Sequence, residues 1–366
     1  GQPIHAAPDG FVIPVVYVAF PETAMGWLLG FDVAAAAADA SGPLRVGLNE
    51  RGAALTGAAA GDVIEIETRT GTVVRVEVAA IVPASILGGS ELVMSTSAAD
   101  RLGEPPDTRA VIWGFDSRAE LDAAITASGL EQRSNTGVAR SWDPLEPDST
   151  LGTLSMKERL GPPWFQVGEG SAVTMHPTWR AQNLTNGRVL LNETIPISAR
   201  CHVRVVDALR AALADVAAAG LTGGIDVVNA NTYGGCYAPR FSRGSWFLSR
   251  HAWGTALDIN TVANCQGCVP QMDCDVVRIF RRHGFAWGGN FAYPDGMHFE
   301  WVGERRDQIA FDSTYCDNIV APAGADVPAG DGRVVAATVS AAANPDLRGV
   351  GVLTAALGDP HGEHGH

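Results

Sequence analysis

The sequence is short of lysine and of positive charge as a whole. Lys157 is the only lysine among 366 residues, and arginine supplies the rest of the 26 basic side chains, against 40 acidic ones. The net charge of −14 would repel a phosphate backbone, and no basic patch stands out along the sequence. Nucleic acid is therefore not an expected partner.

Long apolar runs are missing as well. The most apolar stretch, residues 10–31, is interrupted by Pro14, Pro21 and Glu22. Neither uninterrupted piece approaches the roughly 20 residues that a helix needs to span a bilayer. We therefore expect no membrane-spanning segment in this sequence.

Cysteine is absent from the first 200 residues, and all six cysteines lie between Cys201 and Cys316. An even number confined to one region favours disulfides formed in an oxidising compartment. The alternative is a structural zinc site on Cys265, Cys268 and Cys274, but such sites usually pair two short knuckles and this cluster offers one. We predict disulfides, with the pairing left open.

The first part of the chain, residues 1–130, is expected to form a separate α+β domain. Apolar and polar residues alternate over 63–67 and 73–78, with a glycine-containing turn between them, which predicts a β-hairpin. Short helices are expected over 97–102 and 117–127. The hairpin region faintly resembles the extracytoplasmic domain of permeases of the FtsX/MacB type.

Composition divides the rest of the chain into three parts. Residues 131–163 are rich in Pro, Gly, Ser and Asp and are expected to be a linker. Residues 164–320 are expected to form a second domain, with helices over 202–219 and 274–283. Residues 321–366 form a low-complexity tail rich in Ala, Gly and Pro.

Two short runs in the second domain bring together residues that ligate metals. In the first, His251 precedes an expected strand over 256–260 on which Asp258 lies among small residues. In the second, Asp295 precedes His298 by three residues, with Gly296 allowing a bend between them. Each residue alone has an ordinary explanation, as a hydrogen-bonded core histidine or a turn acceptor.

Taken together, two histidines and one aspartate suit a catalytic zinc site. Three protein ligands leave a fourth position for water, unlike a closed structural site. A further carboxylate that does not bind the metal can accept the proton of that water. The same residue types therefore predict both a metal centre and a general base.

The two runs read Ser-x-His-x-x-Gly-x-Ala-x-Asp and, about 40 residues later, Asp-x-x-His-Phe-Glu. In order and spacing this pattern resembles the VanY-type D-alanyl-D-alanine carboxypeptidases and the related L-alanyl-D-glutamate endopeptidases. The resemblance covers about residues 164–302. It implies a hedgehog-like zinc peptidase fold with a small antiparallel sheet and flanking helices.

The resemblance also implies individual roles. His251, Asp258 and His298 would bind Zn²⁺, and Asp295 would be the general base. Endopeptidase-like members often carry aspartate where carboxypeptidase members carry glutamate, so Asp295 favours the endopeptidase-like branch. Arg240 matches an arginine that binds substrate or steadies the oxyanion, although its sequence setting differs from the usual one.

Several neighbours are candidates for supporting roles. Glu300 shares a strand face with His298 and could orient that imidazole, or compete with Asp295 as the base. Ser249 is expected to fix the loop before His251 by hydrogen bonding. The aromatic residues either line the substrate groove or pack in the core, namely Tyr237, Trp253 and Trp287.

The sequence thus predicts a secreted or surface-anchored bacterial zinc peptidase that cuts peptidoglycan stem peptides. The alternative is an inactive zinc-binding module that recognises or senses the cell wall, as occurs on this fold in hedgehog-type proteins. A third possibility gives the main role to the first domain as a partner-binding element. No residue in 1–130 identifies a ligand for it.

Overall fold

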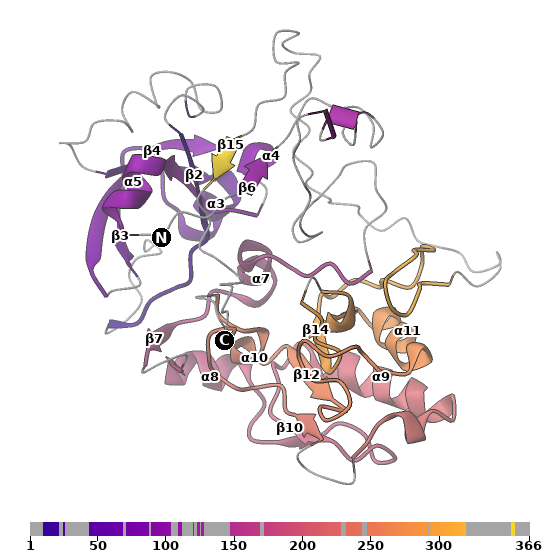
Figure 1. The fold of residues 1–366 in the computed structure, drawn as a ribbon. Coiled ribbons are helices and arrows are strands. Elements are labelled where there is room, and N and C mark those ends of the chain that lie inside the picture. Colours follow the sequence, from indigo (N-terminus) through magenta and orange to yellow (C-terminus); the bar gives the residue numbers. More distant parts are fainter. Residues whose placement is uncertain are drawn as a thin grey trace.

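The computed structural model describes residues 10–21, 25, 44–68, 71–87, 89–103, 109–111, 120, 123–124, 126–127, 147–168, 172–227, 232–243, 247–291, 293–319 and 353–355. These stretches form a mixed α+β protein, which agrees with the expected class (Figure 1). Among them, no helix combines the length and the apolar character that crossing a membrane requires.

A five-stranded sheet organises the N-terminal part. Its order is β1-β5-β2-β4-β3, with bounds Tyr17–Phe20, Leu92–Ser95, Leu44–Asn49, Val73–Val82 and Val63–Glu67. β1 is parallel to β5 and β2 to β4, whereas the other neighbours are antiparallel. The accompanying helices are α3 (Glu50–Thr56), α4 (Ala84–Leu87) and α5 (Thr96–Arg101).

The predicted hairpin is confirmed, because β3 and β4 pair antiparallel in the register that joins Ile64 to Val76. Ile64 and Val76 are buried in the core of this sheet, as the alternation of apolar residues requires. The predicted helix over 97–102 is also confirmed as α5, with Ser95 Oγ accepting from Ala98 N. Most of the helix expected over 117–127 lies outside the described residues.

The stretch expected to be a linker contains helix α7 (Thr153–Leu160), and only residues 147–163 of it are described. Leu154 and Met156 are fully buried. Lys157 forms a buried ion pair with Glu91 of the N-terminal sheet region. Figure 1 shows α7 between the N-terminal sheet and the C-terminal elements. The linker prediction is therefore wrong for residues 153–160. The Pro and Asp content of the stretch suggested a loop, but burial against the rest of the protein stabilises a helix there.

Part of the expected tail is also paired. Leu353–Ala355 forms β15, antiparallel to β6 (Arg109–Val111). The rest of the expected tail beyond Ile319 lies outside the described residues.

The C-terminal part begins with two small antiparallel pairs and then forms a four-stranded sheet. The pairs are β7 (Phe165–Val167) with β8 (Val173–Met175) and β9 (Val189–Leu190) with β10 (Ser198–Ala199). The sheet has the order β11-β12-β14-β13, entirely antiparallel, with bounds Tyr233–Gly234, Ala256–Ile259, His298–Trp301 and Phe285–Trp287. The helices and 3-10 turns are α8 (Pro177–Asn183), α9 (Val206–Ala218), η2 (Thr222–Gly224), α10 (Arg250–Trp253), α11 (Cys274–Arg282) and η3 (Gly288–Asn290).

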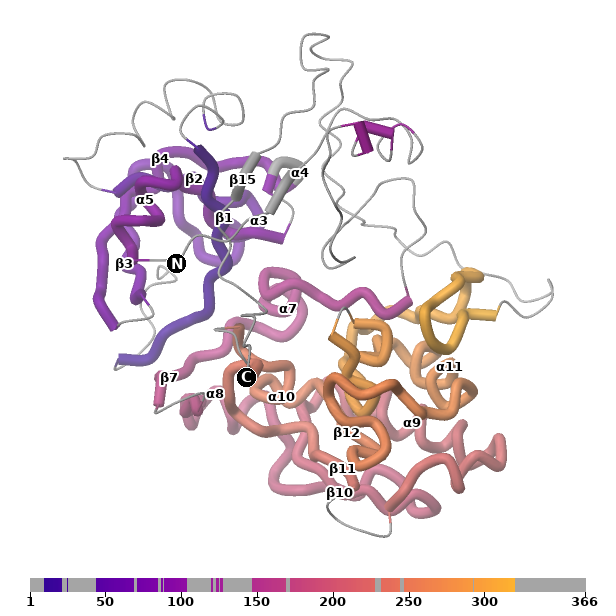
Figure 2. Tube along the Cα trace, in the orientation of Figure 1, coloured from indigo at the N-terminus to yellow at the C-terminus, as the bar shows by residue number. Residues whose placement is uncertain are grey.

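One face of this sheet packs against α9 and α11. Leu257, Ile259 and Phe299 are fully buried in a cluster with the apolar residues of both helices. Since successive strand residues point to opposite faces, Asp258 and His298 lie on the other face. Figure 2 follows the chain through β12 and the two helices. The apolar sides of α9 and α11 therefore cover one face of the sheet, and the polar residues of β12 and β14 lie on the opposite face.

Helix α9 begins four residues later than predicted. His202 N donates to Gly254 O, and Arg204 N donates to His202 Nδ1, so this segment bonds outside a helical pattern. Val203, expected on the apolar face, is exposed. The helix expected over 274–283 is confirmed as α11.

The disulfide prediction is confirmed. Three bonds join Cys201 to Cys236, Cys265 to Cys268 and Cys274 to Cys316, and no cysteine is free. The alternative of a structural zinc site on the Cys265 cluster is therefore wrong.

Candidate metal centre

The register of β12 and β14 places Asp258 beside His298. The two residues are directly opposite one another in the antiparallel ladder, and neighbours in such a pair meet on the same face. His298 Nδ1 lies 3.0 Å from Asp258 Oδ1. Residues 40 positions apart in sequence therefore meet through strand pairing alone.

His251 reaches the same point from the short helix α10. Ser249 caps this helix, and its Oγ accepts from His251 N at 3.2 Å, which is the loop-fixing role predicted for Ser249. The helix ends at Gly254 with φ +74°, where a Cβ would lie 2.9 Å from His202 N. This turn brings His251 Nε2 to 3.1 Å from Asp258 Oδ2.

Backbone and side-chain acceptors fix the tautomers of both histidines. His251 Nδ1 lies 3.3 Å from Gly235 O, and His298 Nε2 lies 3.3 Å from Glu300 Oε2. Both partners only accept, so these ring nitrogens carry protons. The other nitrogens, His251 Nε2 and His298 Nδ1, face the Asp258 carboxylate and are the atoms that a metal ion would take as ligands.

Ring nitrogens at 3.0–3.2 Å from the Asp258 carboxylate need either protons or a metal ion between the nitrogens and the oxygens. His251, Asp258 and His298 form a group that could hold a metal ion, with ligand atoms all within 4.8 Å of one another. In a tetrahedral zinc site with bonds of about 2.0–2.1 Å, the ligand atoms lie roughly 3.4 Å apart. The donor set and its spacing fit this ion.

The charges in the site are strongly coupled. Burial alone would lower the pKa of His298, but hydrogen bonds and charges from Asp258 and Glu300 outweigh burial and raise this pKa to about 10. Burial would raise the pKa of Asp258, yet the two histidines lower it well below its usual range. The site is therefore built to hold positive charge beside an ionised Asp258.

Glu300 is held between two cationic partners. Its Oε1 accepts from Arg250 Nε at 3.3 Å while Oε2 accepts from His298, and the residue is buried. Burial would raise the pKa of Glu300, but Arg250 and then His298 outweigh burial and lower it. A carboxylate with this low proton affinity, already occupied on both oxygens, suits the orientation of His298 better than proton transfer.

Asp295 lies on the turn that leads into β14. Its backbone N donates to Gly288 O at 2.8 Å, and its carbonyl accepts from His298 N at 3.0 Å. A Cβ on Gly288 would lie 2.5 Å from Asp295 O, so this close approach requires glycine. These backbone contacts thus fix the position of the Asp295 Cα, from which the carboxylate extends.

The Asp295 carboxylate has free hydrogen-bonding capacity. Its Oδ1 is buried and has no hydrogen-bond partner among the described residues. Burial and the nearby Asp258 carboxylate raise the pKa of Asp295, and interactions with His298, His251 and Arg240 only partly offset this effect. A carboxylate that faces the metal-ligand group, with raised proton affinity and a free oxygen, can act as a general base.

Arg240 and Tyr237 lie on the segment that supplies Gly235 O. Arg240 makes one long contact, from Nη1 to Ala238 O at 3.5 Å, and its charge reaches Asp295. Tyr237 lies under Arg200, whose Cζ is 5.5 Å from the ring centroid. Arg240 is therefore near the site without a carboxylate partner among the described residues.

The two predicted tryptophans lie in the core rather than along a groove. Trp253 and Trp287 are at most 1% exposed, so neither can wall an open cleft. Trp287 Nε1 donates to Gly296 O at 2.8 Å and so supports the turn between Asp295 and His298. For these residues the core-packing alternative is the correct one.

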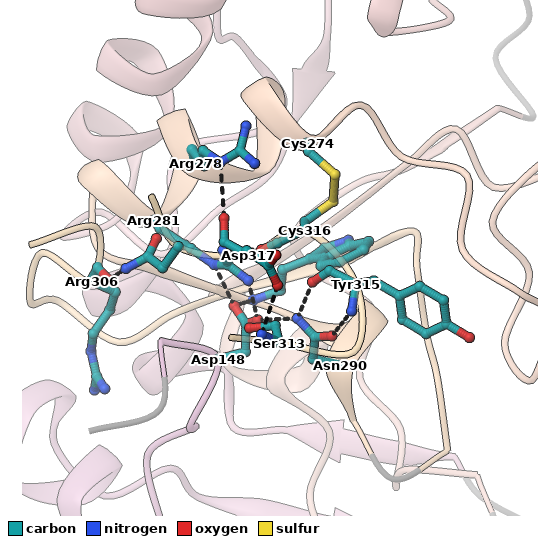
Figure 3. A network of polar contacts seen from close by, with 12 residues as sticks. Asp148, Cys274, Arg278, Arg281, Asn290, Arg306, Ser313, Tyr315, Cys316 and Asp317 are labelled. Carbon is teal, nitrogen blue, oxygen red and sulfur yellow. Dashed lines mark hydrogen bonds and ion pairs between the residues drawn. A yellow bond between two sulfur atoms is a disulfide. The ribbon is translucent and has the colours of Figure 1, made fainter. Parts of the chain in front are cut away.

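Sequence reasoning missed Arg250, Gly235 O and Asp148. Arg250 directly precedes His251, and its pairing with Glu300 depends on a contact across 50 residues that no local pattern signals. Asp148 accepts hydrogen bonds from Arg281 of α11, from Trp287 N of β13 and from Asn290 of η3 (Figure 3). These bonds attach the segment before α7 to the C-terminal sheet and its helix.

Comparison with known protein families supports the resemblance. Residues 243–301 match the family model described as D-alanyl-D-alanine carboxypeptidase. This segment contains His251, Asp258, Asp295, His298 and Glu300, whereas Arg240 and Tyr237 precede it. No curated protein and no solved structure matches the chain. The match confirms the suspected family over this segment and supports a hydrolase of the peptidase class.

Proposed function

We propose that this protein is a zinc-dependent peptidase that hydrolyses amide bonds in peptidoglycan stem peptides, as a D-Ala-D-Ala carboxypeptidase or an L-Ala-D-Glu endopeptidase. The observation that carries the proposal is the convergence of two imidazole nitrogens on Asp258, with the opposite ring nitrogens held by Gly235 O and Glu300. The family match over residues 243–301 supports the choice of reaction and of substrate class.

The chain's own residues divide the chemistry between them. His251, Asp258 and His298 would hold Zn²⁺, which when bound lowers the pKa of a water and polarises the substrate carbonyl. Asp295 accepts the proton of the attacking water on its free Oδ1 and later delivers it to the leaving amine. Arg240, with no carboxylate partner among the described residues, offers its guanidinium to the developing oxyanion.

The proposal extends to fold and location. The antiparallel sheet backed by α9 and α11 supports a hedgehog-like peptidase domain over 164–320, with the N-terminal sheet as a separate domain. Three disulfides favour a protein that works outside the cytoplasm, either secreted or attached to the cell envelope. Peptidoglycan, the proposed substrate, lies in that compartment.

Digestion of purified sacculi tests the proposal. The protein is incubated with sacculi with and without a chelator, and the released fragments are analysed by mass spectrometry. Zinc-dependent release of fragments cut within the stem peptide is the expected result. Identical fragment profiles with and without chelator would overturn the proposed activity. A metal analysis that finds no zinc in the purified protein would overturn the proposed zinc site.

A further inference from the structure

A second cluster of cationic side chains lies outside the metal centre. Arg180 and Arg200 line a pocket of about 430 Å³ together with Leu184, Thr185 and Asn186. A pocket of this volume is large enough for a peptide side chain and its neighbours.

The two arginines add positive charge to one site of a protein whose net charge is −14. No carboxylate of the described residues ion-pairs with either, whereas Arg250, Arg281 and Arg305 each hold one. The Arg180 Nε is buried and has no hydrogen-bond partner among the described residues. A buried donor without an acceptor is costly, so the pocket favours an incoming anion.

Tyr237 and a backbone carbonyl hold the Arg200 guanidinium group in place. Arg200 Cζ lies over the Tyr237 ring, and its Nε donates to Thr185 O at 3.3 Å. Burial raises the pKa of Tyr237, and the charges of Arg180 and Arg200 partly oppose the rise, so both guanidinium groups lie near this ring. Preorganised guanidinium groups of this kind suit carboxylates, which they bind through two parallel hydrogen bonds.

The pocket is linked to the metal centre through one chain segment. Gly235 O orients His251, and Tyr237 follows two residues later, so the two Cα atoms are at most about 7 Å apart. The Cys201–Cys236 disulfide joins the residue after Arg200 to the residue before Tyr237. Arg200 Cζ lies 5.5 Å from the Tyr237 ring and Ala238 N donates to His251 O at 3.0 Å, so one side of the pocket and the metal centre share this segment.

We propose that Arg180 and Arg200 form a subsite for a carboxylate of the substrate peptide, away from the bond that is cut. This inference rests on the proposed peptidase function and specifies which stem peptides the site accepts. Stem peptides with free internal carboxylates are favoured over those in which the same groups are amidated.

The test compares two synthetic stem peptides of one sequence, with internal carboxylates free or amidated and the C-terminus unchanged. The intact protein is expected to show a kcat/KM roughly tenfold or more higher for the free form, mainly through KM. In the double variant R180Q/R200Q this ratio falls to near one, while in R210Q, which changes an exposed arginine on α9, it is unchanged.

A second variant tests the same subsite in case the double variant R180Q/R200Q does not fold. Asn186 lines the pocket and is exposed, so N186D places a competing carboxylate there with little effect on folding, and it also abolishes the preference. Calorimetry measures binding of both peptides in parallel, independently of turnover. Binding without cleavage of either peptide contradicts the peptidase function alone; equal cleavage or equal binding of both forms by the intact protein overturns the carboxylate subsite.

Discussion

Glu300 accepts a hydrogen bond from His298 Nε2 at 3.3 Å and so directs the other nitrogen of that ring at Asp258. The same carboxylate is held by Arg250. The orientation of a ligand candidate therefore depends on a buried chain of charges, Arg250 to Glu300 to His298, that extends away from the metal position.

The variant E300Q tests this relationship. The amide keeps the shape of the side chain but removes the negative charge that fixes the His298 tautomer. We expect zinc affinity to fall by roughly 10- to 100-fold, measured by competition with a chromogenic chelator. The matched control is E304Q, which changes an exposed carboxylate just beyond the same strand and should leave affinity unchanged. An unchanged zinc affinity in E300Q would contradict the role of Glu300 in orienting His298.

The variant D295N separates an enzyme from a binding module. If Asp295 is the general base, stem-peptide cleavage should fall by about 10²- to 10⁴-fold, because the amide cannot accept the proton. Zinc content should remain that of the unchanged protein, since Asp295 is not among the proposed ligands. The control is D312N, an exposed aspartate. Full activity in D295N would show that another residue is the general base. If the unchanged protein and D295N both bind sacculi and neither cleaves them, the recognition module is favoured.

The metal-free protein should lose stability as the pH rises above neutrality. The pKa of His298 is raised from its ordinary 6.5 to about 10, so its protonated form stabilises the folded state below pH 6.5. That contribution is lost progressively between pH 6.5 and 10. The measurement is the difference in melting temperature between the chelator-treated protein and its H298Q variant across this range. The difference should shrink with rising pH, and a constant difference would contradict the prediction.

Asp148 should be a major determinant of stability although it lies in a stretch whose composition predicted a linker. Its carboxylate pairs with Arg281, both side chains are at most 1% exposed, and it also accepts from Trp287 N and Asn290. Removing one partner of such a buried pair typically costs about 3–5 kcal/mol. Chemical denaturation of D148N should show a loss of this size.

The control for Asp148 is an exposed ion pair on α11, the helix that carries Arg281. Asp275 pairs with Arg278 of α11 at the surface, so D275N should cost about 1 kcal/mol or less. If D148N and D275N were equally stable, the buried network in Figure 3 would not hold the segment before α7 to the domain.

Local patterns predicted the elements whose stability comes from their own periodicity. The hairpin of β3 and β4 follows directly from alternating apolar residues, and helix α11 from helical apolar spacing. The start of α9 did not follow, because His202 bonds to Gly254, a residue 52 positions away that no window of sequence contains.

The sequence by itself determined which residues could make the candidate site, because His251, Asp258, Asp295 and His298 occur in two short runs with strict spacing. Only the tertiary structure decided how they act. Strand register placed Asp258 against His298, and acceptors from distant segments, Gly235 O and Glu300, set which nitrogen of each ring faces Asp258. Ring orientation and burial arise from contacts between segments far apart in the chain, and spacing along a sequence does not contain that information.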